Sequence, residues 1–468
     1  MFSNKHNNLI NLIKDSQSLK FIDVESNKIY YLNDMLFDLD TMDLPRSLGF
    51  LYLDTSLISL KVYLTFLNSP HALVLLSDSI DLKLKENLED SYLPTFIIDS
   101  KRAKIPKYTT DKITGNASII DLHINTSYTT KLHENIKILL STSGTTGSPK
   151  LVKLSEDNIL KNALSICEYL PIATTDVTPL NLPLHYSYGL SVLHSNAISG
   201  TTIVCGLPDI LNKDFWNYLE EHKFTSIAGV PFIYEMLKRI GFMKKSYPSL
   251  KYITQAGGNL SQNIKMEFYE YCNDNAIEFF VMYGQTEATA RISYVPPADL
   301  KNKITSIGKP IKNGKITIDD KTGELLYSGP NVFGGYANEI ENLACWEDIV
   351  HLRTGDLADK DEHGFYYIKG RLKRIVKVFG NRINLDEIEA YLKSRLNMSL
   401  LACTGIDDKI LLIAHSNEAL NESELKKAIF ASYKIQGSAI KFKYFEELPK
   451  NKSDKIDYNK IILQYLDN

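Results

Sequence analysis

The sequence has few cysteines, and they are not arranged as in a metal site or a disulfide framework. There are 5 in 468 residues, widely spaced and never in a Cys-x-x-Cys pair. A zinc site or a set of disulfides would bring cysteines together at short, recurring spacings. We therefore interpret them as buried free thiols of a protein in a reducing compartment.

Long apolar runs and an excess of charge of one sign are also missing. No run reaches the ~18 apolar residues of a membrane span, because residues 48–67 are broken by Asp54 and Lys61 and instead suggest a strand and then a buried helix. The N-terminus lacks the apolar core and small residues of a secretory signal. With 53 basic and 56 acidic residues, the net charge of −3 argues against binding nucleic acid by bulk charge. We expect a cytoplasmic globular protein.

Short apolar runs followed by helical patterns fill most of the chain up to about Gly308. Runs such as 72–76 (ALVLL) and 278–282 (EFFVM) have the length and composition of buried strands. Strands that alternate with helices favour layers of parallel α/β structure. The expected buried strands are 72–76, 136–141, 201–205, 226–230 and 278–282.

The pattern then changes to that of antiparallel sheet. Segments 315–319, 323–328 and 365–369 are short, alternating and bounded by turns, which indicates a small β-subdomain. Helical patterns at 385–396 and 422–433, with strand-like segments around them, indicate a small α+β domain at the C-terminal end. The predicted fold class is therefore α/β.

The most informative stretch is residues 140–150, LSTSGTTGSPK. Directly after an expected strand it places two glycines, five hydroxyl side chains before Gly147, and a terminal lysine. Glycines let the backbone approach an anion, and backbone N–H groups, hydroxyls and Lys150 can bind phosphate oxygens. A Walker A loop needs Gly-Lys-Ser/Thr, but Pro149 precedes Lys150 and Leu151 follows it. We expect a phosphate loop of another kind.

This loop resembles the signature of the adenylate-forming superfamily, which includes acyl-CoA synthetases, aryl acid ligases, luciferases and the adenylation domains of peptide synthetases. Further segments resemble the family's other motifs in the same order, from about residue 136 to 458, whereas residues 1–135 carry no recognisable motif. These segments are 283–287 (YGQTE), 306–310 (SIGKP), 354–356 (TGD), 370–389 (GRLKRIVKVFGNRINLDEIE) and 448–457 (LPKNKSDKID).

The resemblance implies roles for residues around the nucleotide. Thr286 would contact phosphate, and Glu287 would hold Mg²⁺, which suits a carboxylate beside phosphates. Asp356 would accept from both ribose hydroxyls. Lys455 would bridge the substrate carboxylate and the α-phosphate. The other ATP- or AMP-binding residues that the resemblance implies are Thr142, Ser143, Gly144, Thr145, Thr146, Gly147, Lys150, Ala256, Gly257, Gly258, Tyr283, Gly284, Gln285 and Arg371.

The resemblance also implies an acyl pocket and a thiol tunnel. His185 would be the aromatic gate beside the reacting carboxylate, and Gly380 would line the tunnel. Members that activate amino acids place an Asp near this gate, but none occurs between Val177 and Pro208. Because a buried unpaired ammonium is costly, a fatty or aryl acid is favoured over an α-amino acid. The expected pocket walls are Tyr188, Gly229, Val230 and Pro231.

The implied reaction has two steps and two domains. Residues 1–370 would form a large adenylating domain with the ATP and acyl sites, and residues 371–468 a small mobile domain with the catalytic lysine and a hinge near Lys373. The acid would be activated as acyl-AMP with release of pyrophosphate, then passed to a thiol. ATP, Mg²⁺ and either CoA or the phosphopantetheine of a separate acyl carrier protein are implied. The alternatives are an amino-acid adenylating enzyme that loads a carrier, a non-catalytic nucleotide-binding protein, and an oxygenase of the luciferase kind.

Three residues depart from the family's pattern. Asp454 replaces the glycine before Lys455, Leu151 replaces the glycine usual after Lys150, and Asn259 stands where many members have proline. None of these changes removes a reacting group. Together they indicate a divergent branch of the family. The basic run 369–382 could be a solvated surface or a docking site for CoA phosphates or an acidic carrier.

Overall fold

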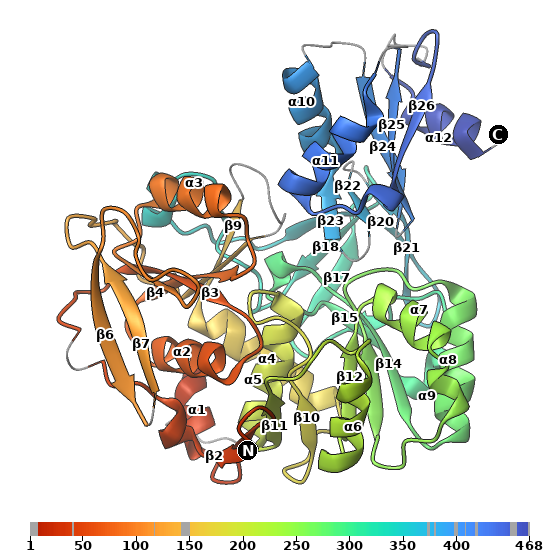
Figure 1. Ribbon diagram of the computed structural model, residues 1–468. Helices are drawn as coiled ribbons and strands as arrows, with labels where there is room; N and C mark the ends of the chain where they lie inside the picture. Colours follow the sequence, from red (N-terminus) through yellow and green to blue (C-terminus); the bar gives the residue numbers. More distant parts are fainter. Residues whose placement is uncertain are drawn as a thin grey trace.

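The structure, a computed structural model, describes most of the chain. The described residues are 8–39, 42–116, 118–141, 150–371, 375–378, 381–396, 401–407, 409–416, 420–449 and 456–466. They form six β-sheets with α-helices packed around them (Figure 1). Within these residues, no helix is both long enough and apolar enough to cross a membrane.

The largest sheet has eight strands and is built mainly by the N-terminal third of the chain (Figure 1, red to orange). Its four central strands are parallel, and antiparallel strands flank them on both sides. All residues of its apolar strand LGFLYL are buried, as expected of a parallel strand covered on both faces. In spatial order the strands are β19 (Tyr336–Ala337), β9 (Leu151–Leu154), β8 (Ile138–Ser141), β4 (Ala72–Ser77), β3 (Leu48–Leu53), β5 (Phe96–Asp99), β7 (Ser118–Ile124) and β6 (Thr109–Gly115).

A second, five-stranded sheet lies beside the first and carries the central motif of the sequence. Its first three strands are parallel and the last two antiparallel. The YGQTE motif begins at the last residue of the third strand, which places it at the carboxyl edge where α/β proteins bind ligands. The strands are β12 (Ser226–Gly229), β13 (Tyr252–Gln255), β14 (Glu278–Tyr283), β15 (Ser293–Val295) and β16 (Lys309–Pro310).

Two four-stranded sheets complete the larger part of the molecule. The first mixes strands from the N-terminus and the middle of the chain: β10 (Val177–Pro179), β11 (Thr202–Cys205), β1 (Lys20–Asp23) and β2 (Lys28–Tyr30). The second is the predicted antiparallel sheet: β17 (Lys315–Ile318), β18 (Glu324–Ser328), β20 (Leu352–Lys360) and β21 (Tyr366–Arg371).

Helices cover the faces of these sheets, and capping residues in the sequence fix their ends. The Ser155 hydroxyl accepts from the Asn158 N–H at the start of α4, and α5 ends at Gly200, whose φ of +72° is a left-handed cap. The helix predicted within 48–67 is buried almost all round. Helices of this larger part are α1 (Leu9–Asp15), α2 (Leu57–Leu67), α3 (Leu82–Tyr92), α4 (Glu156–Tyr169), α5 (Ser187–Ser199), α6 (Lys213–His222), α7 (Pro231–Arg239), α8 (Gln262–Asp274) and α9 (Pro297–Leu300).

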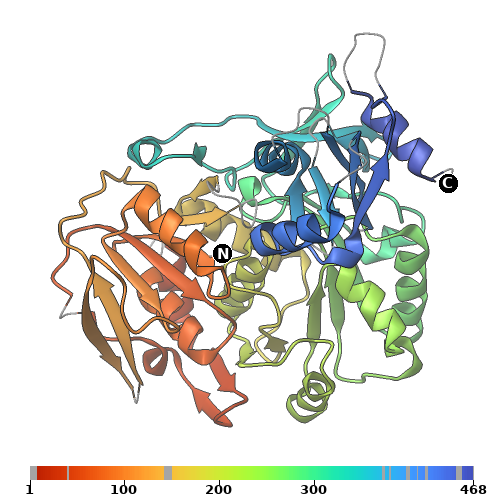
Figure 2. The same cartoon turned by 45° about the horizontal axis from the view of Figure 1, so that its top comes forward.

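The C-terminal elements pack on cores of their own and lie over the junction of the two large sheets (Figure 2, blue). Both helices expected here have the bounds that the sequence indicates. The elements are β22 (Ile375–Val378), β23 (Asn381–Asn384), α10 (Leu385–Leu396), β24 (Leu401–Ile406), β25 (Ile410–His415), α11 (Glu422–Tyr433), β26 (Ile440–Tyr444) and α12 (Tyr458–Leu466). The predicted α/β fold class is confirmed.

Candidate active site

Part of the predicted site falls outside the described residues. This holds for Thr142, Ser143, Gly144, Thr145, Thr146, Gly147, Lys373, Gly380 and Lys455. The two ends of the phosphate loop are nevertheless placed, because β8 and β9 pair antiparallel and set Ser141 opposite Leu151. The loop therefore connects neighbouring strands at the edge of the parallel core.

The end of β14 meets the predicted ribose ligand. The Tyr283 hydroxyl donates to Oδ2 of Asp356 over 2.5 Å. Asp356 is 3% exposed and lies opposite Arg371 in the register of β20 and β21. The Asp356 N–H donates to Oγ1 of Thr354, which stiffens the TGD segment of β20. Two of the predicted nucleotide ligands, Tyr283 and Asp356, are thus in contact from separate strands, and the backbone of a third, Arg371, lies opposite Asp356.

The predicted metal ligand has one carboxylate oxygen held and the other open. Oε1 of Glu287 accepts from the Tyr336 hydroxyl at 2.7 Å. Oε2 is buried and has no hydrogen-bond partner among the described residues. Nζ of Lys150 lies 5.7 Å from the centroid of the Tyr336 ring, so Tyr336 links the phosphate-loop lysine to the acidic residue. An oxygen without a donor beside a phosphate-binding lysine fits the single carboxylate ligand that Mg²⁺ often takes beside phosphates.

The turn that carries Glu287 is tightly packed. A Cβ at Gly284 would clash with the Ala290 carbonyl oxygen, so only glycine fits there. Gln285 is 8% exposed. The Thr286 hydroxyl lies 3.2 Å from that of Ser187, the first residue of α5. This contact joins the YGQTE motif to the segment that holds the predicted carboxylate gate.

The loop after β13 is shaped by its two glycines. Gly257 has φ of +82°, and a Cβ there would clash with the Tyr186 hydroxyl. The Gln255 side chain donates to the Gly258 carbonyl at 2.9 Å, and Ala256 is 1% exposed. The backbone of this predicted adenine-facing loop is therefore held from both sides.

Lys377 of β22 reaches this loop from the C-terminal elements. Its Nζ donates to the Gly257 carbonyl, and a Cβ on Gly258 would lie 3.1 Å from the same atom. The side chain is 7% exposed. Lys377 belongs to the basic run 369–382, for which the sequence suggested a solvated surface or a docking site. Because the Lys377 side chain is buried, it belongs to neither kind of surface.

His185 lies where a neutral imidazole is favoured. Burial lowers its pKa to about 4. Its Nδ1 is buried without a hydrogen-bond partner among the described residues, although part of the side chain stays exposed. At neutral pH the ring is therefore uncharged. Beside a carboxylate it can pack against the substrate or donate a neutral hydrogen bond, but it cannot form an ion pair.

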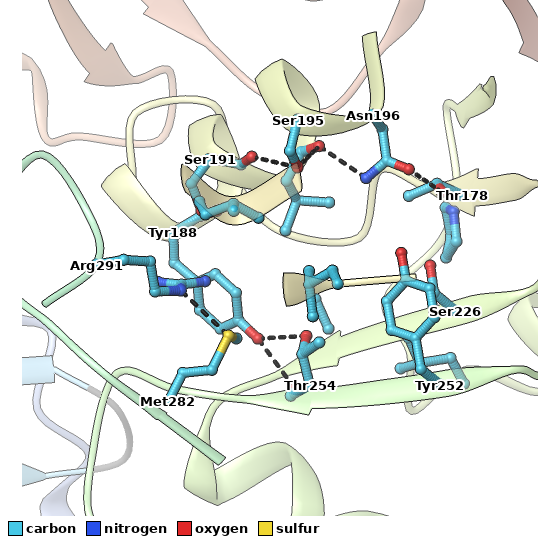
Figure 3. Close-up of a pocket in the computed structure, with 16 residues that line it drawn as sticks. Thr178, Tyr188, Ser191, Ser195, Asn196, Ser226, Tyr252, Thr254, Met282 and Arg291 are labelled. Carbon is cyan, nitrogen blue, oxygen red and sulfur yellow. Dashed lines mark hydrogen bonds between the residues drawn. The ribbon is translucent and has the colours of Figure 1, made fainter. Parts of the chain in front are cut away.

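A cavity lies between α5 and the five-stranded sheet (Figure 3). Of the four predicted pocket walls, Tyr188 lines it, whereas Gly229, Val230 and Pro231 do not belong to its lining. A Cβ on Gly229 would face Tyr234 and Ile233 of α7 instead. The lining residues are Ile166, Leu170, Thr178, Pro179, Tyr188, Ser191, Val192, Ser195, Asn196, Ser226, Ile227, Ala228, Tyr252, Thr254, Met282 and Arg291.

Sequence reasoning missed the polar members of this lining. Arg291 stands eight residues after Tyr283, and the single basic residue between the strands 278–283 and 293–295 was the available signal. The hydroxyl groups of Thr254 and Tyr188 are hydrogen-bonded, with their oxygens 2.7 Å apart. Its position inside an apolar strand gave no indication of this contact.

Comparisons with known proteins give the family of the chain. A family model described as "AMP-binding enzyme" matches residues 62–337. The 2-succinylbenzoate–CoA ligase of Bacillus pumilus is 30% identical over 345 residues, which cover 69% of this chain and 68% of that protein. Oxalate–CoA ligase of Arabidopsis thaliana is 26% identical over 351 residues, 70% of this chain and 67% of that one.

Solved structures share the fold over nearly the whole chain. The o-succinylbenzoate CoA synthetase of Bacillus subtilis, bound with a product analogue, has a TM-score of 0.76 at 20% identity and covers 97% of this chain and 98% of its own. The amide bond synthetase of Marinactinospora thermotolerans has a TM-score of 0.75 at 17% identity, with 98% and 99% covered.

Proposed function

The chain belongs to the AMP-binding enzyme family, and from that premise we propose which of its residues carry the reaction. The protein is an AMP-forming acid–thiol ligase that activates a carboxylic acid as acyl-AMP and passes the acyl group to a thiol. ATP and magnesium serve the first step and CoA accepts the acyl group in the second. We propose that Glu287, Thr286 and Asp356 hold the nucleotide, with Lys455 as the catalytic lysine.

The observation that carries this proposal is the chain of contacts from Lys150 through Tyr336 to Glu287. These residues come from three distant parts of the sequence and lie at the exit of the phosphate loop. The free Oε2 of Glu287 would hold Mg²⁺, which when bound neutralises phosphate charge. Lys150 adds a positive charge on the other side of the Tyr336 ring.

In the first step the protein brings two anions together. A carboxylate oxygen attacks the α-phosphorus, the bond to the bridging oxygen breaks, and pyrophosphate leaves. Asp356 orients the ribose, and Thr286 donates to phosphate from a turn already fixed by Ser187. Lys455 neutralises the developing charge between carboxylate and α-phosphate. Fixing this geometry and charge in advance is where such a site gains rate.

In the second step the thiol loses its proton and attacks the acyl carbon, and AMP leaves. We propose that residues 371–468 move as a domain about Lys373 between the two steps, because they pack on cores of their own. Lys377 would then fix one orientation by holding the Gly257 carbonyl. A separate carrier protein is the alternative acceptor. A cytoplasmic location fits the free cysteines among the described residues.

We propose an acyl or aryl acid as the substrate, because the segment 177–208 around His185 contains no Asp to pair with an α-ammonium group. The first test is acid-dependent pyrophosphate release from Mg·ATP across fatty, aryl and amino acids. Lys455→Ala should abolish it, by about 10²-fold or more. Lys460→Ala, an exposed lysine on α12, is the matched control and should behave as the wild type. Equal release by all three proteins would disprove the role of Lys455, and no release with any acid would disprove the function.

A further inference from the structure

Arg291 is a buried cation in the wall of the cavity. Its side chain comes from the segment between the YGQTE turn and β15 and is 3% exposed. It points toward Tyr188 and Met282, with its guanidinium carbon 4.3 Å from the centroid of the Tyr188 ring (Figure 3). It donates to the Met282 sulfur at 3.3 Å and to the Ala290 carbonyl at 3.4 Å, and the Tyr169 hydroxyl is a further, neutral hydrogen-bond partner.

These partners are neutral and weak for a buried charge. In the described part of the chain, no carboxylate lies within 4.0 Å of the Arg291 guanidinium, so it forms no ion pair there. Arginine keeps its charge in proteins, and buried charges are normally paired. A thioether is a poor acceptor for a guanidinium N–H. The protein therefore holds a desolvated cation whose best partner is missing from its own side chains.

Other polar side chains of the cavity have hydrogen-bond partners within the protein. The Ser191 and Ser195 hydroxyls donate to carbonyls of α5, and the Thr178 hydroxyl donates to the Asn196 side chain at 2.7 Å. The Tyr188 hydroxyl is held by Thr254. None of these groups carries a charge, so Arg291 dominates the electrostatic potential of the cavity and favours an anion there.

The residues beside Arg291 pack against parts of the predicted site, because Tyr188 and Met282 share one buried cluster with Ala256, and Val230 packs against that cluster. Tyr188 directly follows Ser187, whose hydroxyl contacts that of Thr286. A substrate whose reacting carboxylate lies at Thr286 and His185 would have to pass the Tyr188 ring to reach Arg291.

We propose that Arg291 binds a second carboxylate at the far end of the acyl substrate and makes the enzyme selective for dicarboxylic acids. The inference rests on the proposed function and names the substrate class of that site. A carboxylate presents two oxygens to the guanidinium fork, and the pair is shielded from water. The Met282 thioether gives way to it, because methionine has flexible rotamers and its sulfur accepts only weakly.

Matched acids separate this role from general binding. Short aliphatic and benzene dicarboxylic acids are compared with their half-amides, which keep the shape but remove the second charge. Wild-type protein should use at least one dicarboxylic acid with kcat/KM about 30-fold or more above that of its half-amide, as expected for a buried charge pair. Arg291→Met should lose this preference, mainly because kcat/KM for the dicarboxylic acid falls while that for the half-amide changes little. Arg291→Lys should keep part of the preference. Arg353→Met, at an exposed arginine, is the control and should keep it fully.

Binding measured without turnover keeps the two proposals distinguishable. Calorimetric titration of the AMP-loaded full chain with the same acids should give tighter binding of the dicarboxylic acid to wild type but not to Arg291→Met. Equal affinity for dicarboxylic acid and half-amide, or an unchanged preference in Arg291→Met, would overturn the inference while pyrophosphate release could still establish the ligase. Selective binding without pyrophosphate release from any acid would support the anion site and count against the proposed function.

Discussion

Arg102, beside the eight-stranded sheet, and Arg291, beside the five-stranded sheet, are both removed from water but have different partners. Arg102 contacts Glu89 at 2.5 Å and Asp99 at 2.7 Å, and Lys85 also pairs with Asp99. Burial by itself would lower the pKa of Arg102, but the two carboxylates raise it above its usual value. Arg291 has only neutral partners: a thioether, a carbonyl, the Tyr169 hydroxyl and an aromatic face.

The difference separates a structural cation from one that is available to a ligand. Around Arg102 every charge is balanced within the fold, and the Tyr52 hydroxyl donates to Glu89 as well. The same distinction holds for acids. Glu89 is fully engaged, whereas Glu287 keeps a buried oxygen without a donor in the described residues. A buried charge without an oppositely charged partner lowers stability, so we expect one where the protein uses it to bind a ligand.

The largest effect on stability is expected from breaking the closed network. Arg102→Met leaves Glu89 and Asp99 with less positive charge nearby, and we expect it to lower the free energy of unfolding by about 3 kcal/mol. Urea unfolding at neutral pH measures this. The remaining folded protein should keep its kcat, because the network lies outside the proposed site. A loss of less than about 1 kcal/mol would show that the network resembles a surface ion pair.

The next prediction concerns Glu287 and Glu89, where substitution should affect activity in one case and stability in the other. Glu287→Gln keeps the acceptor for Tyr336 but removes the charge, so we expect pyrophosphate release to fall about 10²-fold and the Mg²⁺ concentration for half-maximal rate to rise. Its stability should stay the same or increase slightly. Glu89→Gln is the control, with the reverse pattern of lower stability and unchanged Mg²⁺ dependence. Identical Mg²⁺ curves for Glu287→Gln and wild type would remove Glu287 as a metal ligand.

Much of the fold could be predicted from the sequence, because local patterns decided it. The helices α10 and α11 and the strands β4 and β14 follow from apolar periodicity and strand length. The eight-stranded sheet could not be derived, since β19 pairs with β9 across almost two hundred residues of chain. Such pairings depend on tertiary packing, which no local pattern encodes.

The candidate site could be predicted where a residue belongs to a motif. The proximity of Tyr283 to Asp356 and of Thr286 to the segment of His185 agrees with motif order. Tyr336 and Arg291 were missed. Tyr336 contacts Glu287 and Lys150, which are distant in sequence, and Arg291 stands out only because it is buried against Tyr188. An aromatic ring that bridges two functional groups has no signature in a single sequence.

A smaller, kinetic effect is expected where the C-terminal elements touch the loop after β13. Lys377→Met removes the hydrogen bond to the Gly257 carbonyl, which we propose fixes one of the two orientations of the C-terminal elements. One half-reaction, either acyl-AMP formation in a single turnover or thioester formation from isolated acyl-AMP, should slow about tenfold, as for the loss of a charged hydrogen bond, and the other should be unchanged. Lys369→Met, at an exposed lysine paired with Asp359, is the control. Equal slowing of both half-reactions would refute an orientation-specific role.

The smallest change in stability is expected from the open cation, and it tests the comparison most directly. Arg291→Met removes a buried charge that no carboxylate in the described chain balances, so the free energy of unfolding should stay within about 1 kcal/mol of wild type or rise. Methionine fills similar space against Tyr188 and Met282. The sign is opposite to that for Arg102→Met under the same urea assay. A loss of stability equal to that of Arg102→Met would mean that Arg291 is needed to hold the fold together, and that its neutral contacts with Tyr188 and Met282 are strong enough to make it a structural residue.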